Sequence, residues 1–193
     1  NLAVMRADFD DRAWQTVSLP HDWAAAGPFL STGPYGGMGR LQTWGPVWYR
    51  RALDIPASDA GKSLYLDVDG AMAYASVWLN GKLVGGWPYG YNSWRVDLTP
   101  YAEPGKPNQL VIRLDSPPES ARWYPGAGLY RHVWLTKTAP VQIGHWGTVV
   151  RTPEVSAEKA RVALEVTVTN RGATAARAQV ETEFFALSRD GKA

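Results

Sequence analysis

ASVWLNGKLV, residues 75–84, is the stretch of this sequence that decides the fold class. Small or apolar side chains at positions 75, 77 and 79 alternate with Ser, Trp and Asn, as a strand with one buried face requires. The pair Asn80-Gly81 ends the strand, and these residue types tolerate the positive φ angles of a type I′ turn. The stretch therefore predicts a β-hairpin that returns through residues 82–84.

The same alternation recurs on both sides of this hairpin. Further strands are expected at residues 47–55, 64–68, 110–114 and 133–137. Clusters of Pro and Gly separate the strands, at residues 33–39, 85–90, 104–107 and 117–118. No segment keeps the period of 3.6 residues that an amphipathic helix needs. The sequence therefore predicts an all-β protein of short strands and tight turns.

A second unit is expected to begin at Ala139-Pro140. Proline cannot donate a hydrogen bond to a sheet ladder, and it biases the preceding residue away from helix, so it ends the strand at 133–137. We therefore predict a first domain at residues 1–138 and the start of a second domain at residues 139–193.

The second unit has its own alternating segments. Residues 162–168 and 178–184 are separated by Asn-Arg-Gly at 170–172, which predicts a hairpin of immunoglobulin-like character. Such a sandwich uses about seven strands in about 100 residues, so only its beginning fits before residue 193.

Composition and charge exclude several classes of partner. With 45% hydrophobic residues, the 193-residue chain can bury a core, and its net charge is only +2 with no basic run, so neither nucleic acid nor a membrane surface is expected as a partner. There is no cysteine, and the histidines at 21, 132 and 145 are not at metal-ligand spacing, so we predict no bound metal and no cofactor. The first residues lack the pattern of a secretory leader, so any such leader would already have been removed.

Aromatic residues are unusually abundant, with ten Trp and nine Tyr. Two interpretations stay open for each ring. The commoner role of a large aromatic is to fill a core, whereas a flat exposed ring can stack on the C–H face of a sugar.

Four segments, taken in order, resemble the sugar-binding domain of family 2 glycoside hydrolases. They are WQTVSLPHDW at 14–23, VWYRR at 47–51, VWLNGKLVG at 77–85 with Gly90-Tyr91 after it, and SARWYPGAGLYRHVWL at 120–135. The resemblance continues through His-Trp-Gly at 145–147 and Thr-Pro-Glu-Val at 152–155. The β-galactosidase branch is the nearest match, with β-glucuronidase and β-mannosidase relatives behind it.

This resemblance implies a galactose-binding-like jelly-roll sandwich, then an immunoglobulin-like sandwich, then a catalytic barrel that is not in this sequence. Retaining glycosidases use two carboxylates, and in this family both are barrel glutamates, the acid/base following an asparagine. No Asn-Glu pair occurs here, so we predict no catalytic residue in these 193 residues. The partners implied are a carbohydrate substrate and the C-terminal barrel of the same polypeptide. A homo-oligomer is left open, and the export of bacterial relatives favours a periplasmic or secreted location.

The resemblance also points to residues that would contact the sugar. In relatives, the turn matching residues 122–128 reaches the mouth of the barrel. Arg122 stands where β-galactosidases and β-glucuronidases carry an aspartate, and it would either donate hydrogen bonds to the sugar or pair with a carboxylate at the domain seam. Trp123 and Tyr124 would form a platform beside the sugar or pack against the barrel. Trp44 is the candidate from the preceding loop.

His21-Asp22 has the residue types of an acid/base pair, but adjacent residues of an extended segment point to opposite sides. We therefore expect them to tie down the loop after Pro20 through hydrogen bonds. Two functions compete with the glycosidase hypothesis: a free-standing carbohydrate-binding module, and a structural sandwich that mediates only domain or subunit contacts.

Overall fold

The computed structural model describes residues 2–30, 41–118, 121, 123–188 and 190, and within them the protein is all-β, as the sequence predicts. Its helical content there is two short 3₁₀ turns, η1 (Leu2–Met5) and η2 (Ala57–Asp59). Over the same residues, no helix is long and apolar enough to cross a membrane. The chain divides into two compact units, Asn1–Thr138 and Ala139–Ala193.

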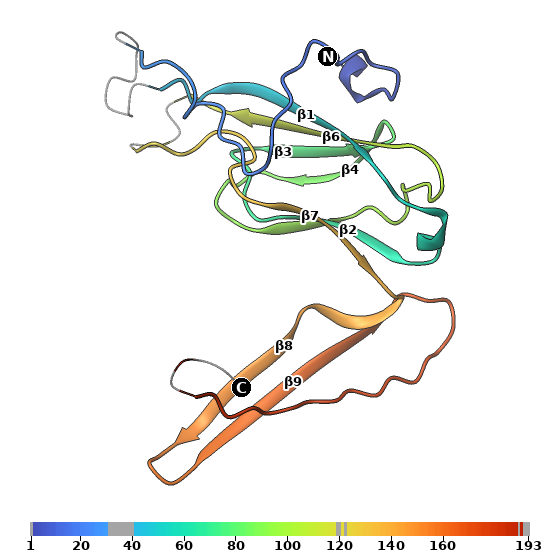
Figure 1. Cartoon of the computed structure of the whole chain (residues 1–193), viewed down its shortest axis with the longest axis vertical. Coiled ribbons are helices and arrows are strands. Elements are labelled where there is room, and N and C mark those ends of the chain that lie inside the picture. The colour runs from blue at the N-terminus through green and yellow to red at the C-terminus, as the bar shows by residue number, and fades with distance from the viewer. Residues whose placement is uncertain (1, 31–40, 119–120, 122, 189, 191–193) are drawn as a thin grey trace. The chain divides into compact units, whose positions relative to one another are not determined.

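The first unit is a sandwich of two antiparallel sheets (Figure 1). The four-stranded sheet has the order β1-β6-β3-β4, formed by β1 (Gly45–Leu53), β6 (Asn108–Ser116), β3 (Ala75–Leu79) and β4 (Lys82–Trp87). The three-stranded sheet has the order β5-β2-β7, formed by β5 (Trp94–Asp97), β2 (Ser63–Val68) and β7 (Val133–Thr138). Most neighbours in these sheets are distant in sequence, so the fold depends on long-range pairing.

The hairpin predicted from residues 75–84 is confirmed. Strands β3 and β4 pair antiparallel, and the turn residues Asn80 and Gly81 have φ angles of 53° and 79°. Both angles lie in the left-handed region that a type I′ turn requires. A register shift between Val77 and Trp78 adds a bulge that the sequence pattern did not show.

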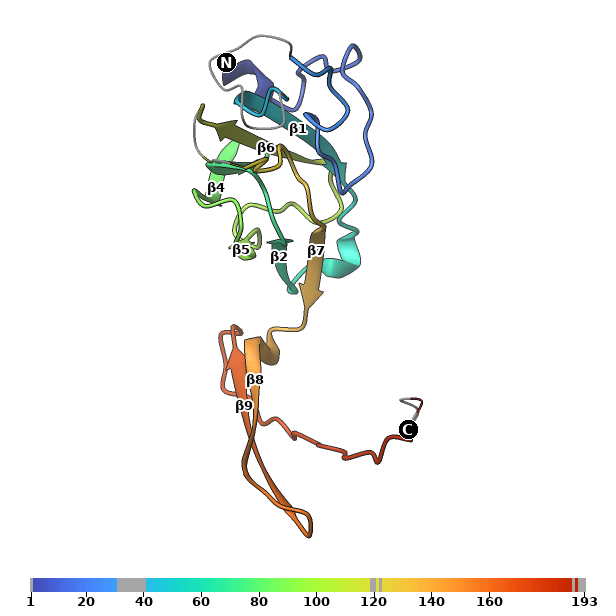
Figure 2. The same ribbon diagram turned by 90° about the vertical axis from the view of Figure 1, so that its left-hand side faces the viewer.

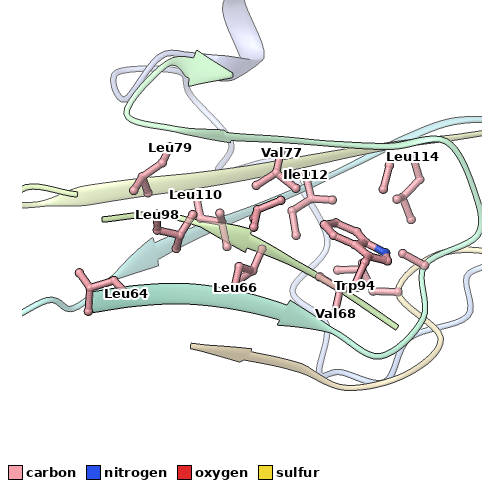
Figure 3. Close-up of a cluster of buried hydrophobic side chains, with 14 of the residues drawn as sticks. Leu64, Leu66, Val68, Val77, Leu79, Trp94, Leu98, Leu110, Ile112 and Leu114 are labelled. Carbon is pink, nitrogen blue, oxygen red and sulfur yellow. The ribbon is translucent and has the colours of Figure 1, made fainter. Parts of the chain in front are cut away.

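The core lies between the two sheets, where alternate residues of the facing strands meet (Figure 3). Burying such a side chain completely contributes about 1.5–3 kcal/mol, so these residues supply most of the driving force for folding. The core residues labelled in the figure are Leu64, Leu66, Val68, Val77, Leu79, Trp94, Leu98, Leu110, Ile112 and Leu114.

The N-terminal segment covers the outer side of β1, away from the three-stranded sheet (Figure 2). Arg50 of β1 holds it there, with only 3% of its side chain exposed. Its Nε donates to Asp11 over 2.8 Å, its Nη1 donates to the carbonyl oxygens of Val4 and Arg6, and its guanidinium lies over the Phe9 ring. One buried cation thus satisfies several acceptors of a segment that has no strand of its own.

We predict that Arg50→Ala lowers the free energy of unfolding by about 1.5–3 kcal/mol, because hydrogen bonds to a charged group are lost from a buried position. The neighbouring Arg51 is exposed, so Arg51→Ala is the matched control and should change the stability by less than about 0.5 kcal/mol. Urea unfolding followed by tryptophan fluorescence measures both. Equal effects of the two substitutions would contradict the role of Arg50 in holding the N-terminal segment against β1.

Asp59 ties the turn η2 to the last strand of the first unit. It is 3% exposed, and its carboxylate accepts hydrogen bonds from Lys137 of β7 at 2.5 Å and from Lys62 at 2.7 Å. The hydrogen bond from Lys137, followed by that from Lys62, lowers the pKa of Asp59 below its ordinary value of 3.8.

The lowered pKa of Asp59 makes stability depend on acid pH. The ionised carboxylate favours the folded state above about pH 4, and this contribution is lost as the pH falls through the lowered folded-state pKa. We therefore predict that Asp59→Asn reduces stability at pH 7 and flattens its dependence on pH below 4. Denaturant unfolding between pH 7 and pH 2.5 tests this, with the exposed Asp54→Asn as the control that keeps the wild-type slope.

The second unit contains β8 (Val141–Val155) and β9 (Ala160–Asn170), which pair antiparallel around a tight connection. The alternating segment 162–168 is indeed a strand, but the hairpin predicted between it and residues 178–184 is wrong. Residues 178–184 form no strand and are exposed. The partner is β8, whose two register shifts interrupt the period-2 pattern and hide the strand from sequence analysis.

Candidate functional site

The segment 121–130, called here the site loop, is anchored by its second half. Residues 125–129 are buried, and they run beside residues 21–23 of the N-terminal region. The backbone N–H of His21 donates to Leu129 O over 2.7 Å, and that of Trp23 donates to Ala127 O over 3.1 Å. Two motifs about 100 residues apart therefore form one short ladder, which holds the base of the loop.

Gly128 lets the base of the site loop pack closely against the core. Gly128 exchanges two backbone hydrogen bonds with Met72, of 3.0 and 3.2 Å, and has φ of 104°. A Cβ atom at this position would lie 2.4 Å from the Tyr49 hydroxyl and 2.8 Å from the carbonyl oxygen of His21. Only glycine combines that φ with so close an approach.

Tyr49 of β1 joins the loop to the sandwich. Its ring packs against the core, and its hydroxyl lies 2.9 Å from Nδ1 of His21 and accepts a 3.4 Å hydrogen bond from the Leu129 N–H. Burial raises the pKa of Tyr49, so its hydroxyl stays neutral around pH 7. The hydroxyl thus contacts both strands of the short ladder.

Asp22 fixes the part of the loop nearer its tip. Its Oδ1 accepts hydrogen bonds from the Ala24 and Ala25 N–H groups, so it ties down the residues after Pro20, as the sequence predicts. The same oxygen accepts a 2.6 Å hydrogen bond from the Tyr124 hydroxyl. His21 and Asp22 therefore have different partners and form no acid/base pair with each other.

The two aromatic residues predicted at the tip lie in different environments. Tyr124 is half-buried against Asp22, whereas Trp123 is 60% exposed. The Nε1 of Trp123 donates to the Tyr91 hydroxyl over 2.9 Å, and the Tyr91 ring meets the Tyr89 ring edge to face. Tyr89, Tyr91 and Trp123 form an exposed group, called here the aromatic ridge. Arg122 lies outside the described residues.

Trp44 lies in a different place from the ridge. It lines an open pocket of about 700 Å³ at the ends of β1, β3 and β6, called here the strand-end pocket. Tyr74, Arg113 and Asp115 share this pocket, and none of the described residues of the site loop lines it. Trp123 therefore lies beside the tyrosines that follow β4, whereas Trp44 shares a pocket with Arg113 and Asp115 of β6.

Sequence reasoning missed Tyr49 and Tyr91 as parts of the site. Both stand in motifs that the family resemblance used, but nothing local in the sequence distinguishes a ring that supports a loop from one that only fills a core. Among the described residues, no cluster of three or more His, Asp or Glu could hold a metal ion.

The described residues form a β-sandwich that carries an anchored loop with an exposed aromatic tip, and comparison with known proteins gives the family of this domain. The chain belongs to the family described as glycosyl hydrolase 2 galactose-binding domain-like, whose profile matches residues 39–149, more than half of the chain. The resemblance seen in the sequence is thus confirmed.

Individual relatives agree with this assignment. A β-galactosidase of Bacteroides ovatus is 40% identical over 174 residues, which cover 90% of this chain and 20% of that protein. The crystal structure of a glycosyl hydrolase family 2 member from Bacteroides cellulosilyticus superimposes with a TM-score of 0.79 at 32% identity, covering 85% of this chain and 22% of that one. A β-glucuronidase structure from Bacteroides uniformis gives 0.74 at 30% identity, covering 87% and 20%. The chain thus spans about a fifth of the length of these relatives.

The contact between Asp22 and Tyr124 can be tested by titration. Burial first, and then the Asp22 carboxylate, raises the pKa of Tyr124 above its ordinary value of 10.0. The neutral phenol is thus favoured in the folded state, and its contribution to stability is complete below about pH 10 and lost as the pH rises further. We predict that Asp22→Asn lowers the pKa of Tyr124 without bringing it fully to 10, because the burial remains.

Carbon-13 NMR of labelled tyrosines measures this titration, and the signal absent from Tyr124→Phe identifies the residue. An unchanged Tyr124 titration in Asp22→Asn would contradict the assigned contact.

Proposed function

We propose that this chain is the N-terminal, non-catalytic part of a retaining glycoside hydrolase of the β-galactosidase type, and that it forms one wall of the sugar site. The family membership supports the glycosidase class, and the relatives named above include both a β-galactosidase and a β-glucuronidase. The single observation that carries the proposal is the site loop, because its base is buried and hydrogen-bonded while Trp123 at its tip is 60% exposed.

In this proposal, the catalytic carboxylates belong to a barrel of the same polypeptide, and the site loop orients the substrate. The exposed face of Trp123 offers an apolar platform for the C–H groups of a pyranose ring. Arg122, directly before it in the sequence, would donate hydrogen bonds to sugar oxygens. A rigid wall of this kind favours catalysis by holding the substrate near its reactive geometry, since misplacement by even 1 Å is costly.

We also infer that residues 139–193 are the beginning of an immunoglobulin-like sandwich. Strands β8 and β9 form a two-stranded sheet with apolar side chains left exposed, including Val150 at 62% and Leu164 at 37%. Further along, Phe184 and Phe185 are 73% and 65% exposed. Isolated hairpins are marginally stable in water, so these side chains are suited to packing against further strands of a larger sandwich.

A free-standing carbohydrate-binding module is the second candidate function. The observation in its favour is the aromatic ridge, because three exposed or partly exposed rings can stack on a saccharide without any barrel. The two functions differ in whether the parent protein hydrolyses a glycoside.

The test is hydrolysis of a panel of nitrophenyl glycosides by the full-length parent protein. We expect cleavage of the β-galactoside, and we expect Trp123→Ala and Arg122→Ala each to lower kcat/KM by an amount equivalent to about 1–3 kcal/mol of transition-state binding. Trp134→Ala is the matched control, because Trp134 is a similarly exposed tryptophan (54%) on the three-stranded sheet, and its Nε1 donates to Asp69 and not to a tyrosine of the aromatic ridge. Its kcat/KM should stay within twofold of wild type.

Two results would overturn parts of this proposal. A parent protein that cleaves no glycoside but still binds saccharide would favour the free-standing module. A parent protein in which Trp123→Ala and Trp134→Ala behave alike would show that the site loop does not form a wall of the sugar site.

A further inference from the structure

Asp22 is fixed by its own turn before it contacts the site loop. Its Oδ1 accepts hydrogen bonds from the N–H groups of Ala24 and Ala25 over 3.1 and 3.2 Å. The next residue along the chain, Trp23, is held by its own N–H, which donates to Ala127 O over 3.1 Å. Because the carboxylate is already tied to its own backbone, it loses little further freedom when it accepts one more hydrogen bond.

The Asp22 carboxylate lies against two points of the site loop. Its Oδ1 also accepts the hydrogen bond from the Tyr124 hydroxyl, over 2.6 Å. Its Oδ2 lies beside Gly126, where a Cβ atom would be 3.7 Å from that oxygen, an ordinary contact distance. Asp22 thus contacts the loop directly after its exposed tip, and it connects this part of the loop to the N-terminal region.

Two contacts bear on the position of Trp123, and they differ in strength. Its own Nε1 donates to the Tyr91 hydroxyl, but these two residues are 60% and 40% exposed, so water competes for the same groups. The next residue, Tyr124, is half-buried and donates to a carboxylate. Hydrogen bonds to ionised groups are about twice as strong as those between neutral groups. The contact between Tyr124 and Asp22 is therefore the stronger of the two.

Building on the proposed function, we infer that Asp22 is a positioning residue of the sugar site, which acts through the Tyr124 hydroxyl on Trp123. Trp123 directly precedes Tyr124, so a displaced Tyr124 ring carries the backbone of Trp123 with it. Misplacing a substrate-contacting group by about 1 Å can cost on the order of a hundredfold in rate. A carboxylate from the N-terminal region thereby sets the geometry of a site that it does not itself line.

The experiment measures kcat/KM of the full-length parent protein for a nitrophenyl β-galactoside. Tyr124→Phe removes only the hydroxyl, and we expect it to lower kcat/KM about tenfold. Asp22→Asn keeps an oxygen acceptor but loses the charge, so we expect a smaller loss of about threefold. Asp69→Asn is the matched control, because the Asp69 carboxylate also accepts a hydrogen bond from an aromatic side chain, that of Trp134. Its kcat/KM should stay within about twofold of wild type.

Two double substitutions separate positioning from a merely structural role. In a Tyr124→Phe background, Asp22→Asn should change kcat/KM by less than about twofold, because the carboxylate has no hydroxyl left to hold. In a Trp123→Ala background, Tyr124→Phe should cost less than about threefold, because the ring that it positions is absent. A structural role would instead lower the activity by the same factor in either background.

A further comparison ranks the two contacts of Trp123. Tyr91→Phe keeps the ring and removes only the hydroxyl that accepts from Trp123 Nε1. Because this hydrogen bond is exposed, its loss should lower kcat/KM less than Tyr124→Phe does. The reverse order would show that Tyr91, and not Asp22, positions the tryptophan.

The outcomes distinguish failure of the positioning role from failure of the proposed function. Wild-type kcat/KM for Tyr124→Phe, in a parent that cleaves the galactoside, would overturn the positioning role and leave the proposed function standing. An equally large loss on Tyr124→Phe in the Trp123→Ala background would show that the hydroxyl supports the fold and not the ring. A parent protein that hydrolyses no glycoside would overturn the proposed function, and the positioning role with it.

Discussion

The candidate site depends on the close approach of Gly128 to the Tyr49 hydroxyl. Because glycine has no side chain, the site loop can enter the sandwich, pair with Met72 and receive the backbone hydrogen bond from His21 in the same place. A larger residue would meet the tyrosine oxygen at 2.4 Å, and both strands of the short ladder would have to move. The position of the exposed tip at Trp123 therefore depends on this buried contact.

Charge compensation is the second constraint on what this surface recognises. Among the described residues of the first unit, the buried Arg50 pairs with Asp11 and the largely buried Arg95 pairs with Asp67. Because these charges are paired and the net charge of the chain is only +2, the electrostatic field that could attract an anionic ligand is weak. In the proposed function, the exposed aromatic rings would then make the main contacts with the carbohydrate.

Sequence reasoning succeeded where the structure is local and periodic. The hairpin at residues 75–84 was predictable because alternation and an Asn-Gly turn act within ten residues. It failed at β8, because two register shifts break the alternation and Trp146 takes a φ of 53° there. Alternation also led to the wrong prediction of a strand at residues 178–184. A period of two residues shows which face of a strand each side chain would take, but it does not show whether a partner strand is present.

The sequence by itself determined the all-β class, most strands of the sandwich and the family, because these follow from short-range patterns and motif order. Only the tertiary structure decided which side chains meet. Asp22 and Tyr124 are 102 residues apart, and their contact exists because two loops are carried to one end of the sandwich by long-range strand pairing. For the same reason Trp44 and Trp123, predicted to serve one site, have different neighbours: one lies at the end of a sheet beside a charged pair, the other on a ridge of tyrosines.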